Sequence, residues 1–243
     1  MVVQHNMTAM NTNRQMTSVQ SALSKSTEKL SSGYKINRAG DDAAGLSISE
    51  KMRAQIRGLN KASTNSQDGI SLIQVAEGAL NETHSILQRM NELATQAAND
   101  TNTSTDRSAL QAEVNQLVSE IDRIQSTTQF NTMNLLDGSF TGKRLQVGSL
   151  QGQYISITIN NMNATSLSVN SLSLSTYTKA GTSMSKIQNA INAVSTQRST
   201  LGALQNRLEH TINNLSTTSE NTQSAESRIR DTDIDRKSTR LNS

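Results

Sequence analysis

The stretch IQVAEGALNETHSILQRMNELA, residues 73–94, decides the fold of this 243-residue chain. Its residues Ile73, Leu80, Leu87 and Ala94 are all apolar and stand seven positions apart. A seven-residue repeat places such side chains on one face of an α-helix, which is the seam along which helices pack together. The stretch therefore predicts a helix that buries one narrow apolar face against other helices.

The same apolar face extends toward the N-terminal side and predicts one very long helix. Ile48, Met52, Ile56 and Leu59 continue it in steps of three or four residues. The chain contains no Pro, so no residue of that kind interrupts the backbone hydrogen bonds of a helix. We expect the helix to end near Ala98 after roughly 55 residues, or about 80 Å, a length typical of rods and bundles.

Three other segments carry helical spacing. An amphipathic helix is expected over residues 3–31 and is ended by Gly33, and two more are expected over residues 106–128 and 183–229. The short polar turn before residue 106 predicts that this helix folds back on the long one. The expected packing seam consists of Ile73, Leu80, Leu87, Leu110, Leu117, Ile124, Ile187, Val194, Leu201, Leu208 and Leu215.

The spacing of apolar residues changes in the middle of the chain. Residues 130–142 are irregular, and Ile155, Ile157 and Ile159 alternate with polar residues, which is strand spacing. Residues 143–176 are predicted to form one or two β-hairpins. The expected fold class is mainly α, a long antiparallel helical rod or bundle with coiled-coil heptads plus this small β-hairpin region.

Composition excludes several classes of protein. The chain has no Cys and no Trp, with three Tyr and two Phe, so disulfide frameworks, thiolate sites and a thick aromatic core are excluded. The formal net charge is +3, and the basic residues alternate with acidic ones, so we expect no nucleic-acid partner. The sequence lacks a run of about 18 apolar residues and a cleavable signal peptide, so membrane insertion is not expected.

No stretch carries the full pattern of a chemical site. Residues 138–143 resemble a phosphate-binding loop but have one residue too few between the glycines. Residues 100–111 begin like a calcium loop and lack its Gly and Glu. Asp41 and Asp42 fit helix capping better than an acid/base pair, and the three His have no partner at metal-ligand spacing. We expect no enzyme activity, no catalytic residue, no metal and no cofactor.

Particular strings identify a family. They closely resemble conserved segments of bacterial flagellin, the subunit of the flagellar filament, and the resemblance covers about residues 1–233. The strings are residues 30–46 (LSSGYKINRAGDDAAGL), 65–74 (NSQDGISLIQ), 76–82 (AEGALNE), 87–93 (LQRMNEL), 128–131 (TQFN), 201–208 (LGALQNRL) and 227–233 (SRIRDTD).

The resemblance implies a self-assembling structural protein of motility. It implies that residues 1–43 hold the inner-tube helix and its connecting loop. Residues 44–230 then form the outer-tube domain, with its β-hairpins at about 143–176, which leaves no room for a variable surface insert. Residues 231–243 are expected to be a truncated or foreign tail, so we expect the chain to leave residues 1–33 unpartnered and to polymerise poorly alone.

The resemblance also implies partners and a location. These are other flagellin subunits in a homopolymer, the flagellar type III export apparatus, the filament cap and an export chaperone, whose C-terminal site is expected to be missing here. The expected location is secreted and extracellular, in the flagellar filament. Host Toll-like receptor 5 is a further implied partner; its contact motif matches Leu87, Gln88, Arg89, Leu93 and Glu113, which also belong to the implied filament interface.

Three alternatives compete with a flagellin. A hook–filament junction protein belongs to the same superfamily, but residues 30–46 favour flagellin. A flagellin with a metallopeptidase insert requires a His-Glu-X-X-His string, which the sequence lacks. A free-standing helical signalling or binding module is the third.

Overall fold

The computed structural model describes residues 6–233, so all but the first three residues of the segment 231–243, expected to be a truncated or foreign tail, lie outside them. The chain divides into two compact units. One unit contains the segments up to Leu59 and from Thr217 onward, and the other contains Asn60–Ser216. Two helices, α2 (Ala43–Ala97) and α4 (Tyr177–Arg230), contribute to both units. Whether the parts predicted as inner and outer tube correspond to positions in a filament stays a prediction.

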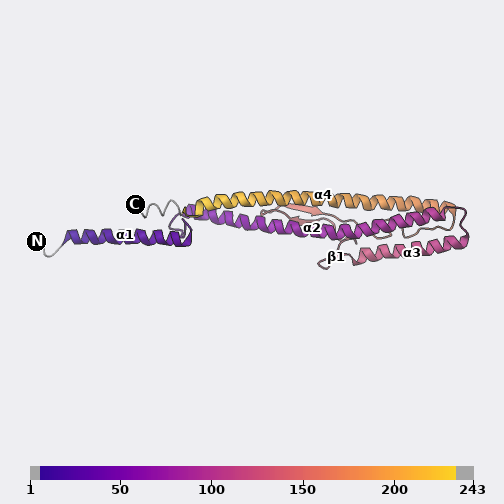
Figure 1. Cartoon of the computed structure of the whole chain (residues 1–243), viewed down its shortest axis with the longest axis horizontal. Helices are drawn as coiled ribbons and strands as arrows, with labels where there is room; N and C mark the ends of the chain where they lie inside the picture. The colour runs from indigo at the N-terminus through magenta and orange to yellow at the C-terminus, as the bar shows by residue number, and fades with distance from the viewer. Residues whose placement is uncertain (1–5, 234–243) are drawn as a thin grey trace. The chain divides into compact units, whose positions relative to one another are not determined.

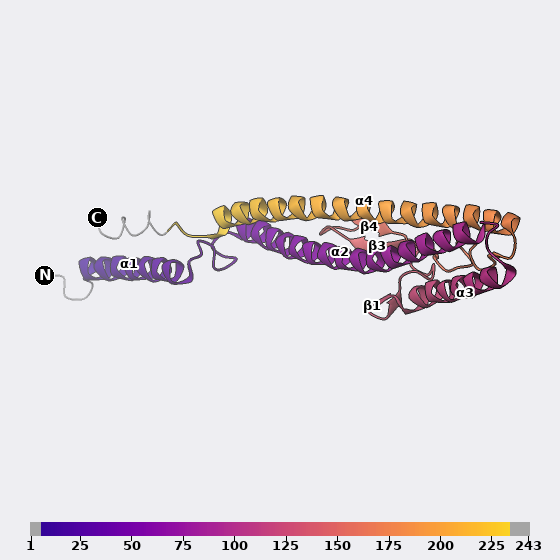
Figure 2. The same ribbon diagram turned by 45° about the vertical axis from the view of Figure 1, so that its right-hand side comes forward.

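The unit Asn60–Ser216 is built on three helices. Figures 1 and 2 show α3 (Ser104–Thr127) and the α4 part of this unit lying along α2. A short turn reverses the chain after α2, and a capping box of Thr103 and Asp106 starts α3. Arg107 holds the turn closed, because its Nε donates to the Ala97 carbonyl at 2.9 Å and its Nη2 contacts Asp100 at 3.2 Å.

The core of this unit is the seam between the helices. Ile73, Leu80 and Leu87 of α2 are fully buried at 0% exposure, in the same apolar cluster as residues from α3 and α4. The α4 members of the predicted seam are Ile187, Val194, Leu201 and Leu208 at 0% and Leu215 at 6% exposure. In α3 the deepest residues are Val114 and Ile121, whereas Leu110, Leu117 and Ile124 are partly buried beside them.

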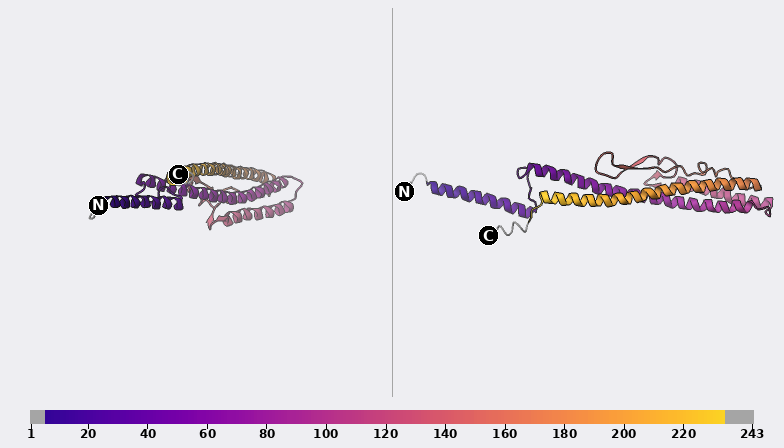
Figure 3. Two further views of the ribbon diagram at one scale, coloured as in Figure 1. Left: turned by 60° about the vertical axis from the view of Figure 1, so that its left-hand side comes forward. Right: turned by 90° about the horizontal axis from the view of Figure 1, so that it is seen from above.

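Two antiparallel hairpins complete this unit. The first joins β1 (Gln129–Phe130) to β2 (Met133–Asn134), and the second joins β3 (Lys143–Gln146) to β4 (Tyr154–Ile157). In the second hairpin Leu145 pairs with Ile155, whose side chain is 3% exposed. The hairpin and the loop after it lie on one side of the helices (Figure 3). The first hairpin falls in a segment that the sequence predicts to be irregular.

Residues 158–176 contain no strand, so the strand spacing over Leu167–Leu174 predicts the wrong local structure. The segment is apolar because it packs inward, with Val169 and Leu174 at 0% exposure. Its backbone bonds to helix side chains instead of to a partner strand. Leu174 N donates to Gln111 Oε1 at 2.7 Å and Ala164 N donates to Asp122 Oδ1 at 2.9 Å.

The other unit contains α1 (Met7–Ser32) and the loop that joins it to α2. Gly33 ends α1 with a φ of 73°, the left-handed conformation that the sequence predicts for it. Asp42 accepts a hydrogen bond from Gly45 N at 2.9 Å and so caps α2. Asp41 Oδ2 accepts from the amides of Arg38 and Asn37, and these bonds lower the pKa of its carboxyl. Asp42 therefore caps α2 as expected, whereas Asp41 does not cap a helix and instead holds the loop at residues 37–38.

Candidate functional site

A charged cluster joins α2 to α3 on the surface of the unit Asn60–Ser216. Arg89 donates from Nε and Nη2 to Glu113 Oε1 at 3.0 and 2.9 Å, and from Nη1 to Glu92 Oε2 at 3.2 Å. These bonds, first those to Glu113, raise the pKa of the Arg89 guanidinium above its ordinary value. All three side chains are exposed, so the cluster presents polar groups in fixed positions and adds little to stability.

The five residues of the predicted receptor-contact motif differ in their exposure to solvent. Gln88, Arg89 and Glu113 are exposed, and the last two are bonded to each other. Leu87 and Leu93 are 0% and 1% exposed, so their side chains belong to the core instead of the surface. The part of the motif that a partner can touch in this structure is therefore polar.

Helix α1 presents a different surface, because none of its residues is buried. Met16, Val19 and Leu23 follow one another in steps of three and four residues, so they line one face of the helix. They are 67%, 67% and 52% exposed. A contiguous apolar face open to solvent marks an interaction surface, so α1 is suited to pack against another helix.

A cluster centred on Arg230 holds the end of α4 to the loop after α1, within one unit. Arg230 Nη1 donates to Glu50 Oε1 at 2.6 Å, and its guanidinium lies 4.9 Å from the centre of the Tyr34 ring. The hydrogen bond from Arg230 is the main cause that lowers the pKa of the Glu50 carboxyl. The backbones join as well, since Lys35 N donates to the Arg230 carbonyl at 2.7 Å and Tyr34 forms a β-bridge with Asp231.

The sequence does not predict that the side chains of the Arg230 cluster meet. Its side chains come from positions up to 196 residues apart in the chain, and helical spacing says nothing about such pairs. The only available signal is that Tyr34 and Arg230 both lie in strings that carry the family resemblance. The cluster ties the loop that follows α1 to the C-terminal end of α4 within this unit.

The described residues offer little for chemistry. Within residues 6–233 no group of three or more Asp, Glu or His side chains gathers in a way that could hold a metal ion. No helix in that part of the chain is long and apolar enough to cross a membrane. Asp100 and Asn102, the start of the apparent calcium loop, are engaged in the α2–α3 turn through Arg107 and the Gln96 carbonyl.

Comparison with family models gives two matches. The model of the bacterial flagellin N-terminal helical region matches residues 3–141. The model of the bacterial flagellin C-terminal helical region matches residues 184–243. Between them they cover both α1–α3 and most of α4.

Individual relatives agree with the family models. A flagellin of Halalkalibacterium halodurans is 55% identical over 236 residues, covering 96% of this chain and 87% of the relative. A flagellin of Bacillus subtilis is 49% identical over 268 residues, with 96% and 88% coverage. The crystal structure of Bacillus cereus flagellin superposes with a TM-score of 0.57 at 35% identity and covers 63% of this chain and 88% of that one.

Proposed function

The chain belongs to the bacterial flagellin family, and from this premise we propose how its parts act in a flagellar filament. It is a structural subunit of the filament and not an enzyme. Family membership implies polymerisation with other flagellin subunits, so the surfaces that matter are those that meet such subunits. That this chain polymerises poorly alone stays a prediction. The proposal concerns which surfaces these are.

The observation that carries the proposal is the exposure of α1. A helix of 26 residues without one fully buried side chain gains little stability from packing within the subunit. Its apolar face of Met16, Val19 and Leu23 gains that packing when subunits assemble. We place α1 in the inner tube of the filament, and the unit Asn60–Ser216, which has a closed core of its own, in the outer tube.

A pair of matched charge substitutions tests this assignment. Leu23→Glu puts a carboxylate on the apolar face, whereas Ser21→Glu puts the same charge nearly opposite on the same helix. Each purified chain is added to preformed flagellin filaments, and the fraction that elongates them is measured by sedimentation and electron microscopy. We expect L23E to lower incorporation at least tenfold and S21E to leave it within a factor of two. Equal incorporation of wild type and L23E would contradict the assignment.

The seam from Ile73 to Leu215 has a separate role in the proposal. Its α2 and α4 members are buried inside one subunit, so they set the stiffness and shape of the outer-tube unit and do not contact neighbours directly. Substitutions there are expected to act on subunit folding first and on filaments only through it.

The remaining partners follow from the family alone. We propose that the chain leaves the cell through the flagellar type III export apparatus, with an export chaperone before and the filament cap after transit, and that the filament is extracellular.

We also propose that Toll-like receptor 5 contacts the cluster of Arg89, Glu113 and Gln88. The support is that these three are exposed and that Arg89 is held in place by Glu113. Arg89→Ala is expected to raise the concentration needed to activate receptor reporter cells at least fivefold. Arg123→Ala, which removes an exposed Arg from an ion pair within α3, serves as the control and is expected to change it less than twofold. An unchanged response to R89A contradicts this contact.

A further inference from the structure

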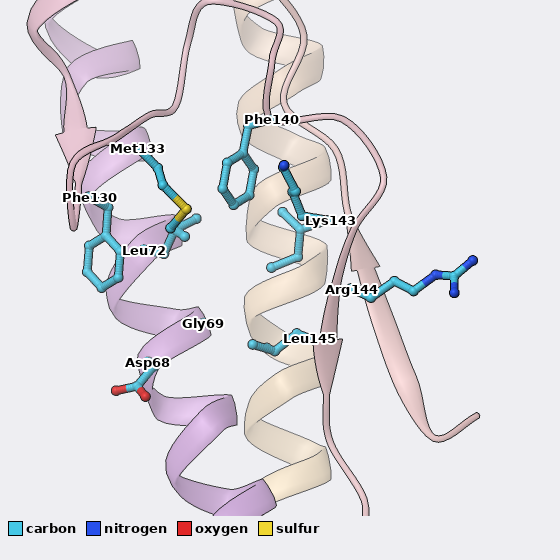
Figure 4. Close-up of a pocket in the computed structure, with 10 residues that line it drawn as sticks. Asp68, Gly69, Leu72, Phe130, Met133, Phe140, Lys143, Arg144 and Leu145 are labelled. Atoms are coloured by element: carbon cyan, nitrogen blue, oxygen red, sulfur yellow. The ribbon is translucent and has the colours of Figure 1, made fainter. Parts of the chain in front are cut away.

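An apolar pocket of about 310 Å³ opens between α2 and the two hairpins, within the unit Asn60–Ser216 (Figure 4). Its inner wall is formed by buried side chains from three segments, namely Leu72, Phe140 and Ile157. The chain has only two Phe residues, and both Phe130 and Phe140 line this pocket. A chain so poor in aromatic residues therefore concentrates its largest apolar rings around a space that they do not fill.

The hairpin β1–β2 forms the outer wall. Phe130 and Met133 are cross-strand partners on either side of a two-residue turn, so their side chains lie on the same face. The turn residues Asn131 and Thr132 have φ values of 47° and 64°. A β-branched residue rarely adopts that left-handed conformation, and such strain tends to collect at functional sites. The strained turn holds Phe130 and Met133 at the pocket although Met133 remains 42% exposed.

Three charged side chains line the pocket, and they differ in whether another group already occupies them. Figure 4 shows the Lys143 ammonium reaching toward the Phe140 ring, and within residues 6–233 that ammonium has no hydrogen-bond or ion-pair partner. Arg144 is turned away and lies 4.7 Å from the centre of the Tyr154 ring. Asp68 stands at the opposite end with its carboxylate pointing away from Lys143 (Figure 4). The pocket therefore offers one available cation beside an apolar wall.

We propose that this pocket binds a small amphipathic anion, a carboxylate that carries a short alkyl chain or a single aromatic ring. The apolar wall buries the tail, and the Lys143 ammonium pairs with the carboxylate. The volume lies at the lower end of the range for small-molecule sites, which suits a ligand of about ten non-hydrogen atoms.

The test uses octanoate and octylammonium as probes, titrated into the full unassembled chain by isothermal titration calorimetry. We expect octanoate to bind one to one with a dissociation constant of about 1 mM, because a ligand of that size buries little surface. Octylammonium, which has the same tail and the opposite charge, is expected to bind at least threefold more weakly. Absence of saturable octanoate binding, or equal binding of the two probes, overturns the proposal.

Two variants and a matched control locate the site. Lys143→Gln is expected to weaken octanoate binding about three- to fivefold, the effect of one exposed charge pair. Met133→Ser removes an exposed part of the wall and is expected to weaken it at least threefold, with circular dichroism confirming the fold. Lys179→Gln removes an exposed ammonium at the start of α4 and should leave binding within a factor of 1.5.

If K143Q binds like wild type, or if K179Q weakens binding as much as K143Q, the proposal is wrong. Loss of filament incorporation in M133S without octanoate binding by wild type points to a neighbouring subunit as the occupant and also overturns it.

Discussion

Gln197 is the polar residue whose removal gives the sharpest test of how the loop after β4 is held. Its side chain is 4% exposed on α4. Nε2 donates to the Thr158 carbonyl at 3.2 Å, and Oε1 accepts from Asn160 Nδ2 at 3.0 Å and, more weakly, from Asn160 N at 3.4 Å. These bonds replace the partner strand that the sequence predicts for this segment.

The variant Gln197→Leu keeps the size of the side chain and removes all three bonds. The half-buried Thr158 carbonyl then lacks a partner, which costs about 1–3 kcal/mol, whereas exposed Asn160 can turn to water at little cost. We expect a loss of about 2 kcal/mol in the free energy of unfolding. In a chain of this size that lowers the melting temperature by about 5 °C.

Urea unfolding followed by circular dichroism measures the effect, with Gln188→Leu as the control on an exposed face of α4. Q188L is expected to stay within about 0.5 kcal/mol of wild type. A double-mutant cycle of Q197L with Asn160→Ala separates the Asn160 bonds from the rest. If Q197L is as stable as wild type, or if Q188L loses as much, the hydrogen bonds of Gln197 do not hold the loop.

Three further substitutions test other parts of the structure. Leu201→Ala, at 0% exposure in the α4 seam, should lower the free energy of unfolding by about 2–5 kcal/mol in the same urea assay, and a loss below 1 kcal/mol would show a loose core. Gly69→Ala places a Cβ against Leu145 Cδ2, and this clash opposes a gain in helix propensity of about 1 kcal/mol, so we expect a net loss of about 1–2 kcal/mol; an unchanged midpoint would show that the Leu145 side chain turns away. The pKa of the Glu50 carboxyl is lowered below its ordinary value of 4.5, chiefly by Arg230, so its contribution to stability is present above that value and is lost as the pH falls through the folded pKa. Wild type should therefore lose stability more steeply than Glu50→Gln below about pH 4.5, and parallel curves of the two chains would contradict the role of the ion pair.

The helices could be predicted from the sequence because burial and spacing agree in them. In α4 the residues that stand seven positions apart from Ile187 to Leu208 are all apolar, and each of their side chains is fully buried. In α3, however, two series of residues spaced seven apart are both apolar. Leu110 and Leu117 form one series, and Val114 and Ile121 form the other. Spacing cannot decide between two apolar sets, so only packing shows that Val114 and Ile121 lie deeper.

The middle of the chain could not be predicted because its structure depends on distant side chains. Alternating apolar residues near Val169 suggest a strand, yet Gln111 and Asp122 of α3 take the backbone hydrogen bonds. The turn between β1 and β2 lacks the glycine that usually signals a two-residue hairpin, since Thr132 occupies a left-handed position. Likewise Arg89 and Glu113 meet only because α3 folds back on α2.

Filament assembly should cover the apolar face of α1, and the absence of Cys from the chain permits a direct measurement of that burial. A single Leu23→Cys variant gives one thiol on that face. Its rate of reaction with a maleimide is measured in the free chain and in filaments that have incorporated it. We predict a fast reaction in the free chain and a rate at least tenfold lower in the filament. Equal rates in the two states contradict the claim.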